Sequence, residues 1–199
     1  MALQEFEHRI RSNLSRLALC LAVAGVTMLT AAPASAQQPF QMTSPAFADN
    51  GIMAQKFAGK FSNNPNCVGE NISPPLQWSN PPAGTRSLAI IMFDQEGRDG
   101  LGVSHWVIYG IDPSLTGLPE GAGDGKFEKA VGGNNIVNQP IYFGGCPPKG
   151  TGMHHYAFTL IATDLEPNAL KPGLTQAQLL EALNTHAKGA TGLIGRWGH

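Results

Sequence analysis

The chain has 199 residues, of which 42% are hydrophobic, and its 13 Lys and Arg are balanced by 14 Asp and Glu. This near-neutral balance excludes a basic field for nucleic acid and a polybasic patch for a membrane surface. The length suits one domain with a proper core, and no internal repeat or low-complexity tract divides the chain.

The first feature along the chain is an apolar leader. Residues 17–31 (LALCLAVAGVTMLTA) carry no charge, follow three arginines and precede the small-x-small triplet at residues 34–36. This pattern predicts a secretory signal at residues 1–36 and a single mature domain at residues 37–199, in the periplasm or secreted. A retained membrane anchor is the alternative, but the run is shorter than the roughly 20 residues that span a bilayer. We therefore expect no integral membrane span in the mature protein.

Two cysteines remain once the leader is removed. Cys67 and Cys146 each lie in a loop rich in Gly, Pro and Asn, and the expected compartment is oxidising. An even count in that setting predicts one disulfide between them. Two free thiols, or one thiol that acts as a nucleophile, are the alternatives. A four-ligand zinc site would need more Cys or His at close spacing than the chain offers.

Three apolar runs are typical of core β-strands: residues 87–93 (SLAIIMF), 105–111 (HWVIYGI) and 155–163 (HYAFTLIAT). They are rich in β-branched and aromatic residues and are bounded by Gly, Pro, Asn and Asp. Weaker strands are predicted at residues 46–61, 76–79 and 193–197. These runs predict a β-sandwich or barrel.

One late helix is predicted at residues 176–188 (QAQLLEALNTHAK). Thr175 can cap its N-terminus, and Gly189 can end it. The residues expected to share its apolar face are Leu179, Leu180, Leu183 and Ala187.

Polar residues gather where the predicted core strands begin or end. Asp94 and Glu96 follow the first strand, His105 begins the second, and 154–156 (HHY) begins the third after a loop stiffened by Gly and Pro. Period-two alternation puts the first of the two adjacent histidines on the same face as Tyr156. Each residue alone has a structural explanation, as a turn acid or a packed histidine. Together, these three strand ends predict one binding site.

The order of these motifs resembles the phosphatidylethanolamine-binding protein family, in its bacterial Raf-kinase-inhibitor-like branch. The matching segments are SPPLQW (73–78), FDQEG (93–97), HWVIYGI (105–111), LPEG (118–121), GGCPPKGTGMHHY (144–156) and FTLIATD (158–164). The ligand-pocket residues that the resemblance implies are Asp94, Glu96, His105, Pro148, His154 and Tyr156. The chain departs from the family pattern in two places. Gln95 replaces the first proline of the Asp-Pro-Asp-x-Pro motif, Glu96 its second Asp and Gly97-Arg98 its x-Pro. His155 replaces an arginine.

The resemblance implies a mainly β fold: an antiparallel sandwich of a large and a small sheet with C-terminal helical segments. It implies a small cavity for a phosphate-like anion or a phospholipid headgroup, with no settled enzymatic activity and no cofactor. Imidazole, phenol and backbone N–H groups can all donate to phosphate oxygens, and a stiff loop holds such donors without an ordering cost. Asp94 can orient a histidine by accepting its N–H.

Other function classes stay open. A hydrolase would need an activated nucleophile, but no G-x-S-x-G motif occurs in the chain. An Asp-His-His metal site is another candidate. The third is a protein-interaction or inhibitor module with an extracytoplasmic partner, which fold analogy alone supports. A homodimer is expected because bacterial relatives often associate.

Overall fold

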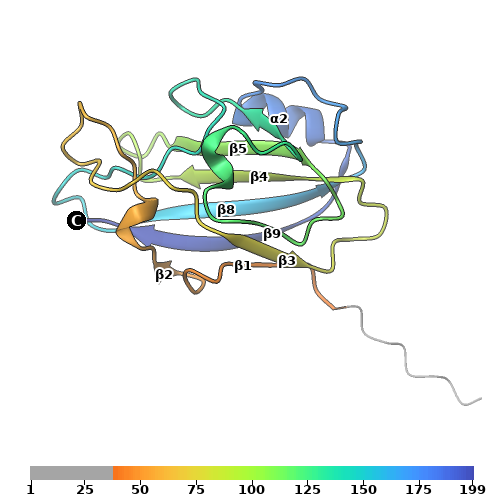
Figure 1. Cartoon of the computed structure of the whole chain (residues 1–199), viewed down its shortest axis with the longest axis horizontal. Helices are drawn as coiled ribbons and strands as arrows, with labels where there is room; N and C mark the ends of the chain where they lie inside the picture. The colour runs from red at the N-terminus through yellow and green to blue at the C-terminus, as the bar shows by residue number, and fades with distance from the viewer. Residues whose placement is uncertain (1–37) are drawn as a thin grey trace, which may run out of the picture. The chain divides into compact units, whose positions relative to one another are not determined.

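Strands dominate the part of the chain that the computed structural model describes, which is residues 38–199 (Figure 1). The predicted leader lies outside these residues. In chain order, the described elements are β1 (Gln41–Thr43), β2 (Gly51–Ile52), η1 (Gln55–Phe57), β3 (Leu76–Ser79), β4 (Ser87–Asp94), β5 (Val103–Ile111), β6 (Gly117–Leu118), η2 (Ala122–Asp124), β7 (Val131–Gly133), β8 (His154–Thr163), α2 (Gln176–Leu183) and β9 (Ala187–Trp197). Within residues 38–199, no helix is long and apolar enough to cross a membrane.

The strands form two sheets of unequal size. The large sheet has the order β2-β9-β8-β4-β5-β7, and the small sheet has the order β1-β3-β6. All neighbouring strands are antiparallel except β2 and β9, which run parallel. The predicted fold class, a mainly β sandwich with a large sheet, a small sheet and a late helix, is therefore confirmed.

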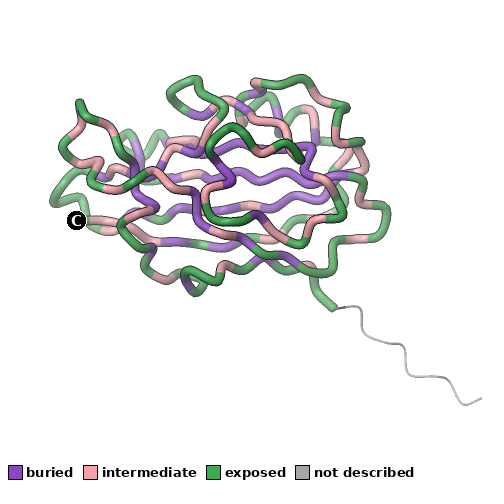
Figure 2. Tube along the Cα trace, viewed as in Figure 1, coloured by how far each residue is buried: buried purple, intermediate pink, exposed green. Residues whose placement is uncertain are grey.

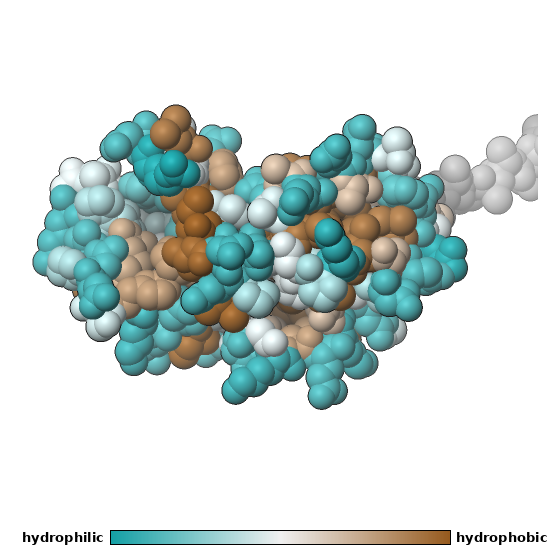
Figure 3. Space-filling view, turned by 90° about the horizontal axis from the view of Figure 1, so that it is seen from above, coloured by the Kyte–Doolittle hydropathy of each residue, from teal (hydrophilic) through white to brown (hydrophobic). Residues whose placement is uncertain are grey.

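Each face of the large sheet packs into its own core, because alternate residues of a strand point to opposite sides. On one face, Leu88, Ile90 and Met92 of β4 pack with residues of the small sheet such as Met42 and Trp78. The other face packs against α2 through a second cluster: Ala89, Ile91, Val107, Tyr109, Leu179 and Leu183. Figure 2 shows the central strands as the most buried part of the trace. Figure 3 shows further apolar residues reaching the surface in patches between polar ones.

The helix is shorter, and β9 longer, than the sequence pattern predicts. Thr175 caps α2 as expected, in a capping box with Gln178. The helix ends at Leu183 rather than near Gly189, and its buried face excludes Leu180, which is 45% exposed. β9 begins at Ala187 because this small-residue segment pairs along the full length of β8. The weak strand predicted at residues 46–61 is mostly wrong, since that segment holds only β2 and η1.

Candidate functional site

The register of the large sheet brings the predicted acid and the predicted tyrosine together. Asp94, the last residue of β4, lies opposite Tyr156 of β8. His154 and Tyr156 are two residues apart in β8 and are both buried, whereas His155 between them is exposed. The alternation predicted from the sequence is therefore confirmed, with His154 on the same face as Tyr156.

A β-bulge directs His105 to this same face. Met92 of β4 pairs with Trp106 of β5, but the next residue, Phe93, pairs with Ser104. His105 is therefore the extra residue of a bulge, a feature that re-aims side chains next to functional sites. Its ring centroid lies 5.2 Å from that of Tyr156, edge to face.

Asp94, His105, His154 and Tyr156 form a buried cluster. The carboxylate of Asp94 makes most of its polar contacts. Its Oδ1 accepts the backbone N–H groups of Glu96 at 2.9 Å and Gly97 at 3.1 Å. Its Oδ2 accepts Nδ1–H of His154 at 2.8 Å and lies 3.8 Å from Nε2 of His105. Burial alone would raise the pKa of Asp94, but the two histidines more than offset it and hold that pKa well below its usual range. Asp94 is therefore a carboxylate at neutral pH.

Each ring nitrogen of His154 has a hydrogen-bond partner. Nδ1 donates to Asp94, and Nε2 lies 3.3 Å from Oγ1 of Thr151. The Thr151 hydroxyl already donates to the carbonyl of Pro148 at 2.8 Å, so its oxygen accepts at His154. Both contacts of His154 are satisfied together only when the ring carries two N–H groups. Asp94 and His154 then form a buried pair without net charge.

Two polar atoms at the centre of the cluster lack partners. His105 donates its Nδ1–H to the carbonyl of Phe143 at 2.6 Å, which leaves Nε2 without a hydrogen bond. The hydroxyl of Tyr156 also has no partner. Among residues 38–199 the other such buried side-chain atoms are Ser104 Oγ, Arg196 Nε and Trp197 Nε1. Burial raises the pKa of Tyr156, and nearby Asp94 adds to the shift, so the hydroxyl keeps its proton.

The Gly- and Pro-rich loop lies directly over Tyr156. A side chain at Gly145 is excluded because its Cβ would come within 2.1 Å of the tyrosine hydroxyl. The carbonyl of Gly145 accepts the N–H of Gly59 at 3.0 Å, and the next residue, Cys146, is bonded to Cys67. The predicted disulfide is thus confirmed, with 4.7 Å between the two Cα atoms.

The side chains of Pro148 and Glu96 lie outside the direct contacts of this cluster, although the backbone N–H of Glu96 donates to Asp94. Pro148 is exposed. It is linked to the cluster only through its carbonyl oxygen, which accepts a hydrogen bond from the Thr151 hydroxyl. Glu96 is also exposed, and its carboxylate binds Nδ1 of His155 at 2.8 Å. Sequence reasoning did not identify Phe143 or Thr151. The position of Phe143 immediately before the Gly-Gly-Cys-Pro-Pro run was the available signal.

The cluster is nearly closed to solvent in this structure. Its four central side chains are only 0–6% exposed: Asp94, His105, His154 and Tyr156. In the part of the chain that the structure describes, no group of three or more His, Cys, Asp or Glu side chains is arranged to hold a metal ion.

Comparison with known proteins gives consistent matches over most of the chain. Residues 43–198 match the family model described as Phosphatidylethanolamine-binding protein. A relative named "Putative lipoprotein LppC", from Mycobacterium tuberculosis, is 37% identical over 166 residues, which cover 82% of this chain and 74% of the relative.

Two solved bacterial structures have a similar fold. The crystal structure of Escherichia coli YbcL, described as a new member of the mammalian PEBP family, has a TM-score of 0.74 at 29% identity. The match covers 81% of this chain and 99% of YbcL. A phosphatidylethanolamine-binding protein homolog from Chlamydia trachomatis has a TM-score of 0.68 at 31% identity, covering 80% of this chain and 97% of that one.

Proposed function

Since the chain belongs to the phosphatidylethanolamine-binding protein family, we propose that it is an extracytoplasmic protein that binds a small phosphate-like anion or a phospholipid headgroup. The proposed site is the cluster of Asp94, His105, His154 and Tyr156. One observation carries the proposal: the Tyr156 hydroxyl and Nε2 of His105 are both buried without hydrogen-bond partners, on rings whose centroids lie 5.2 Å apart. Buried polar atoms are rarely left unpaired, and such atoms call for a water or a ligand.

The charge of the cluster is compatible with an anion. An isolated Asp94 carboxylate would repel phosphate, but the 2.8 Å bond to His154 makes the pair neutral when that ring carries both protons. Tyr156 then supplies a neutral O–H donor, and a protonated His105 supplies an N–H donor. Hydrogen bonds to a charged group are stronger than neutral ones, so two donors can fix one anion.

Binding at this site requires a local movement. The backbone of Gly145 lies against the Tyr156 hydroxyl, so a phosphate oxygen reaches that hydroxyl only if the loop at residues 144–152 shifts outward. In this proposal, the Cys67–Cys146 disulfide limits the movement of the loop, because Cys146 adjoins Gly145. Pro148 and Glu96 would lie at the mouth of the opened site.

The proposed location outside the cytoplasm has two supports besides the predicted leader. The Cys67–Cys146 disulfide is the kind of bond that persists in oxidising compartments. The relative from Mycobacterium tuberculosis carries the name of a lipoprotein.

Calorimetric titration with inorganic phosphate, phosphoethanolamine and glycerophosphoethanolamine tests the proposal. Tyr156→Phe removes one unpaired donor, so we expect affinity to fall roughly ten- to hundredfold while stability is unchanged. A preference for the two ethanolamine compounds over phosphate would identify a headgroup site.

The matched control is Tyr109→Phe on the opposite face of the sheet. Its hydroxyl donates to the carbonyl of Lys171 at 2.7 Å and accepts the N–H of Leu174 at 3.1 Å. Its loss should cost about 1–3 kcal/mol of stability and leave ligand affinity unchanged. The proposal fails if none of the three ligands binds the wild type, or if Tyr156→Phe binds them as tightly as the wild type.

A further inference from the structure

A cavity lies beside β5, and the proposed function does not use it. It has a volume of about 200 Å³ and lies between β5, β7 and the segment that begins at η2. The residues that line it are Trp106, Ile108, Ala122, Gly123, Gly125, Phe127, Ala130, Gly132, Pro140 and Pro172. The four central side chains of the candidate site are absent from this lining.

The cavity has a buried floor and an exposed rim. Trp106 and Ile108 of β5 form part of the floor and are 1% and 4% exposed. Pro140 and Pro172 are exposed and form part of the rim, whereas Phe127 in the wall is half-buried. No charged side chain lines the cavity. Burying a charged ligand group here would therefore be costly, whereas an uncharged apolar group gains by leaving water.

The size of the cavity limits its ligand. An engineered protein cavity of about 150 Å³ lined by apolar side chains stays dry and binds benzene. A volume of about 200 Å³ therefore accommodates one ring with a small substituent, but not a long acyl chain. The half-buried ring of Phe127 favours aromatic partners, which stack offset or edge to face.

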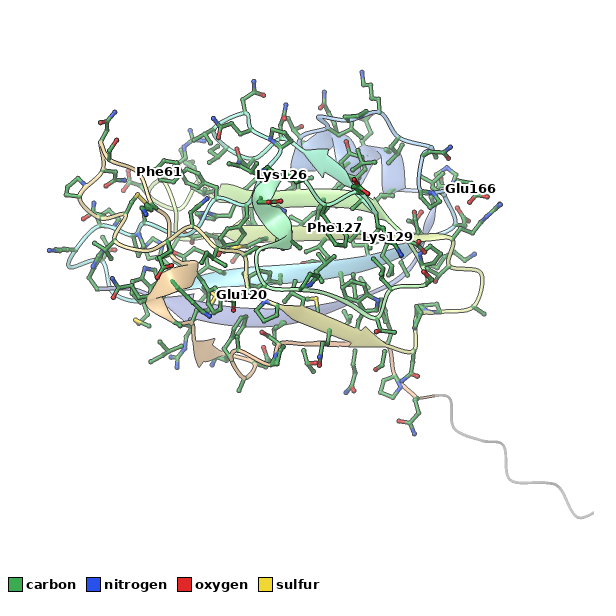
Figure 4. The ribbon with its side chains drawn as sticks, viewed as in Figure 1. Phe61, Glu120, Lys126, Phe127, Lys129 and Glu166 are labelled. Carbon is green, nitrogen blue, oxygen red and sulfur yellow. A yellow bond between two sulfur atoms is a disulfide. The ribbon has the colours of Figure 1, made fainter. Side chains whose placement is uncertain are left out.

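We propose that this cavity binds a small uncharged molecule with a single aromatic ring. The ring would lie against Phe127 and Ala130, above the buried floor to which Trp106 and Ile108 belong. Its polar substituent would point to the exposed rim at Pro140 and Pro172. Figure 4 shows Phe127, together with Lys126 and Lys129 of the same segment, in front of the large sheet. The proposal is independent of the anion site, because the two share no lining side chain.

The backbone at β7 shapes the cavity wall. A Cβ at Gly132 would come within 2.9 Å of both the Cβ and the carbonyl oxygen of Pro140. The missing side chain therefore lets the Pro140 rim approach β7 closely.

Fluorine NMR with 4-fluorophenol and with fluorocyclohexane tests this site. We expect 4-fluorophenol to show saturable line broadening and to bind roughly fivefold or more tightly than the aliphatic ring. Ala130→Leu fills the cavity from a half-buried position and should weaken 4-fluorophenol binding roughly tenfold or more. Ala187→Leu, at an exposed position outside the cavity, is the matched control and should bind as the wild type does.

Two further variants keep the test decisive. Phe127→Leu removes an aromatic wall but keeps an apolar one, so it should abolish the preference for 4-fluorophenol even if Ala130→Leu does not fold. Tyr156→Phe should leave 4-fluorophenol binding unchanged. The proposal is overturned if binding is not saturable, if fluorocyclohexane binds equally well, or if folded Ala130→Leu retains the wild-type affinity.

Discussion

Replacing Asp94 by Asn tests whether a buried charge stabilises the candidate site. The Asn oxygen can keep the bonds from the Glu96 and Gly97 amides, so the variant mainly loses the charged bond to His154. A hydrogen bond to a charged group contributes about 1.5–3 kcal/mol, and we expect Asp94→Asn to lower the free energy of unfolding by this amount at neutral pH. Asp94→Ala leaves all three donors unpaired and should cost about 3–5 kcal/mol.

The lowered pKa of Asp94 gives this effect a pH dependence. Burial acts to raise that pKa, but the histidines lower it below its ordinary value of 3.8. A carboxyl group with a lowered folded-state pKa contributes stability above its unfolded pKa and loses it as the pH falls toward the folded value. The difference in stability between wild type and Asp94→Asn should therefore be constant above the ordinary pKa and shrink below it.

Urea unfolding, followed by tryptophan fluorescence at several pH values, measures this difference. Asp164→Asn is the matched control, because Oδ1 of Asp164 lies 2.8 Å from Nδ1 of His186 but the two side chains are 38% and 40% exposed. Exposed pairs contribute little, so this control should change stability by less than about 1 kcal/mol. Equal stability of Asp94→Asn and wild type, or a difference that persists unchanged at acid pH, would refute the reasoning.

Three further perturbations probe the rest of the fold. Replacing Cys67 and Cys146 by Ser should lower the free energy of unfolding by about 4 kcal/mol, because the bond closes a loop with a sequence separation of 79. Urea midpoints that match the oxidised wild type would contradict this. In calorimetry, Leu179→Ala should lower the free energy of unfolding by about 2–5 kcal/mol. Leu180→Ala, at an exposed position, should lower it by less than about 0.5 kcal/mol. Equal losses would contradict the assigned buried face of α2. Trp106→Ala should cost about 3–5 kcal/mol in urea unfolding, and a loss of less than about 0.5 kcal/mol would contradict its place in the core.

The long strands could be predicted from sequence, but the short ones could not. β4, β5 and β8 are apolar runs long enough to show a pattern, and β3 was placed at its observed bounds. Strands of two or three residues, such as β6, carry no period and form only because a partner strand lies beside them. The first half of β9 was missed because Ala and Lys also favour helices. Its pairing with β8 decides the outcome.

The candidate site shows the same division between local pattern and tertiary context. The shared face of His154 and Tyr156 follows from alternation, which is a property of one strand. The orientation of His105 depends on a bulge between two strands, and simple alternation would have put it on the face opposite Trp106. The contacts of Phe143 and Thr151 come from a loop that only the folded chain brings to the cluster.

The stiffness of the Gly- and Pro-rich loop has a physical explanation in this context. Its backbone must lie against the Tyr156 hydroxyl, which only a glycine at position 145 permits. Glycine increases the conformational freedom of the unfolded chain, so this close approach has an entropic cost. This entropic cost is offset by neighbouring features that restrict the unfolded chain, namely Pro147, Pro148 and the disulfide at Cys146. The loop therefore combines one permissive residue at the contact with rigid residues beside it, which favours a defined position over the Tyr156 hydroxyl.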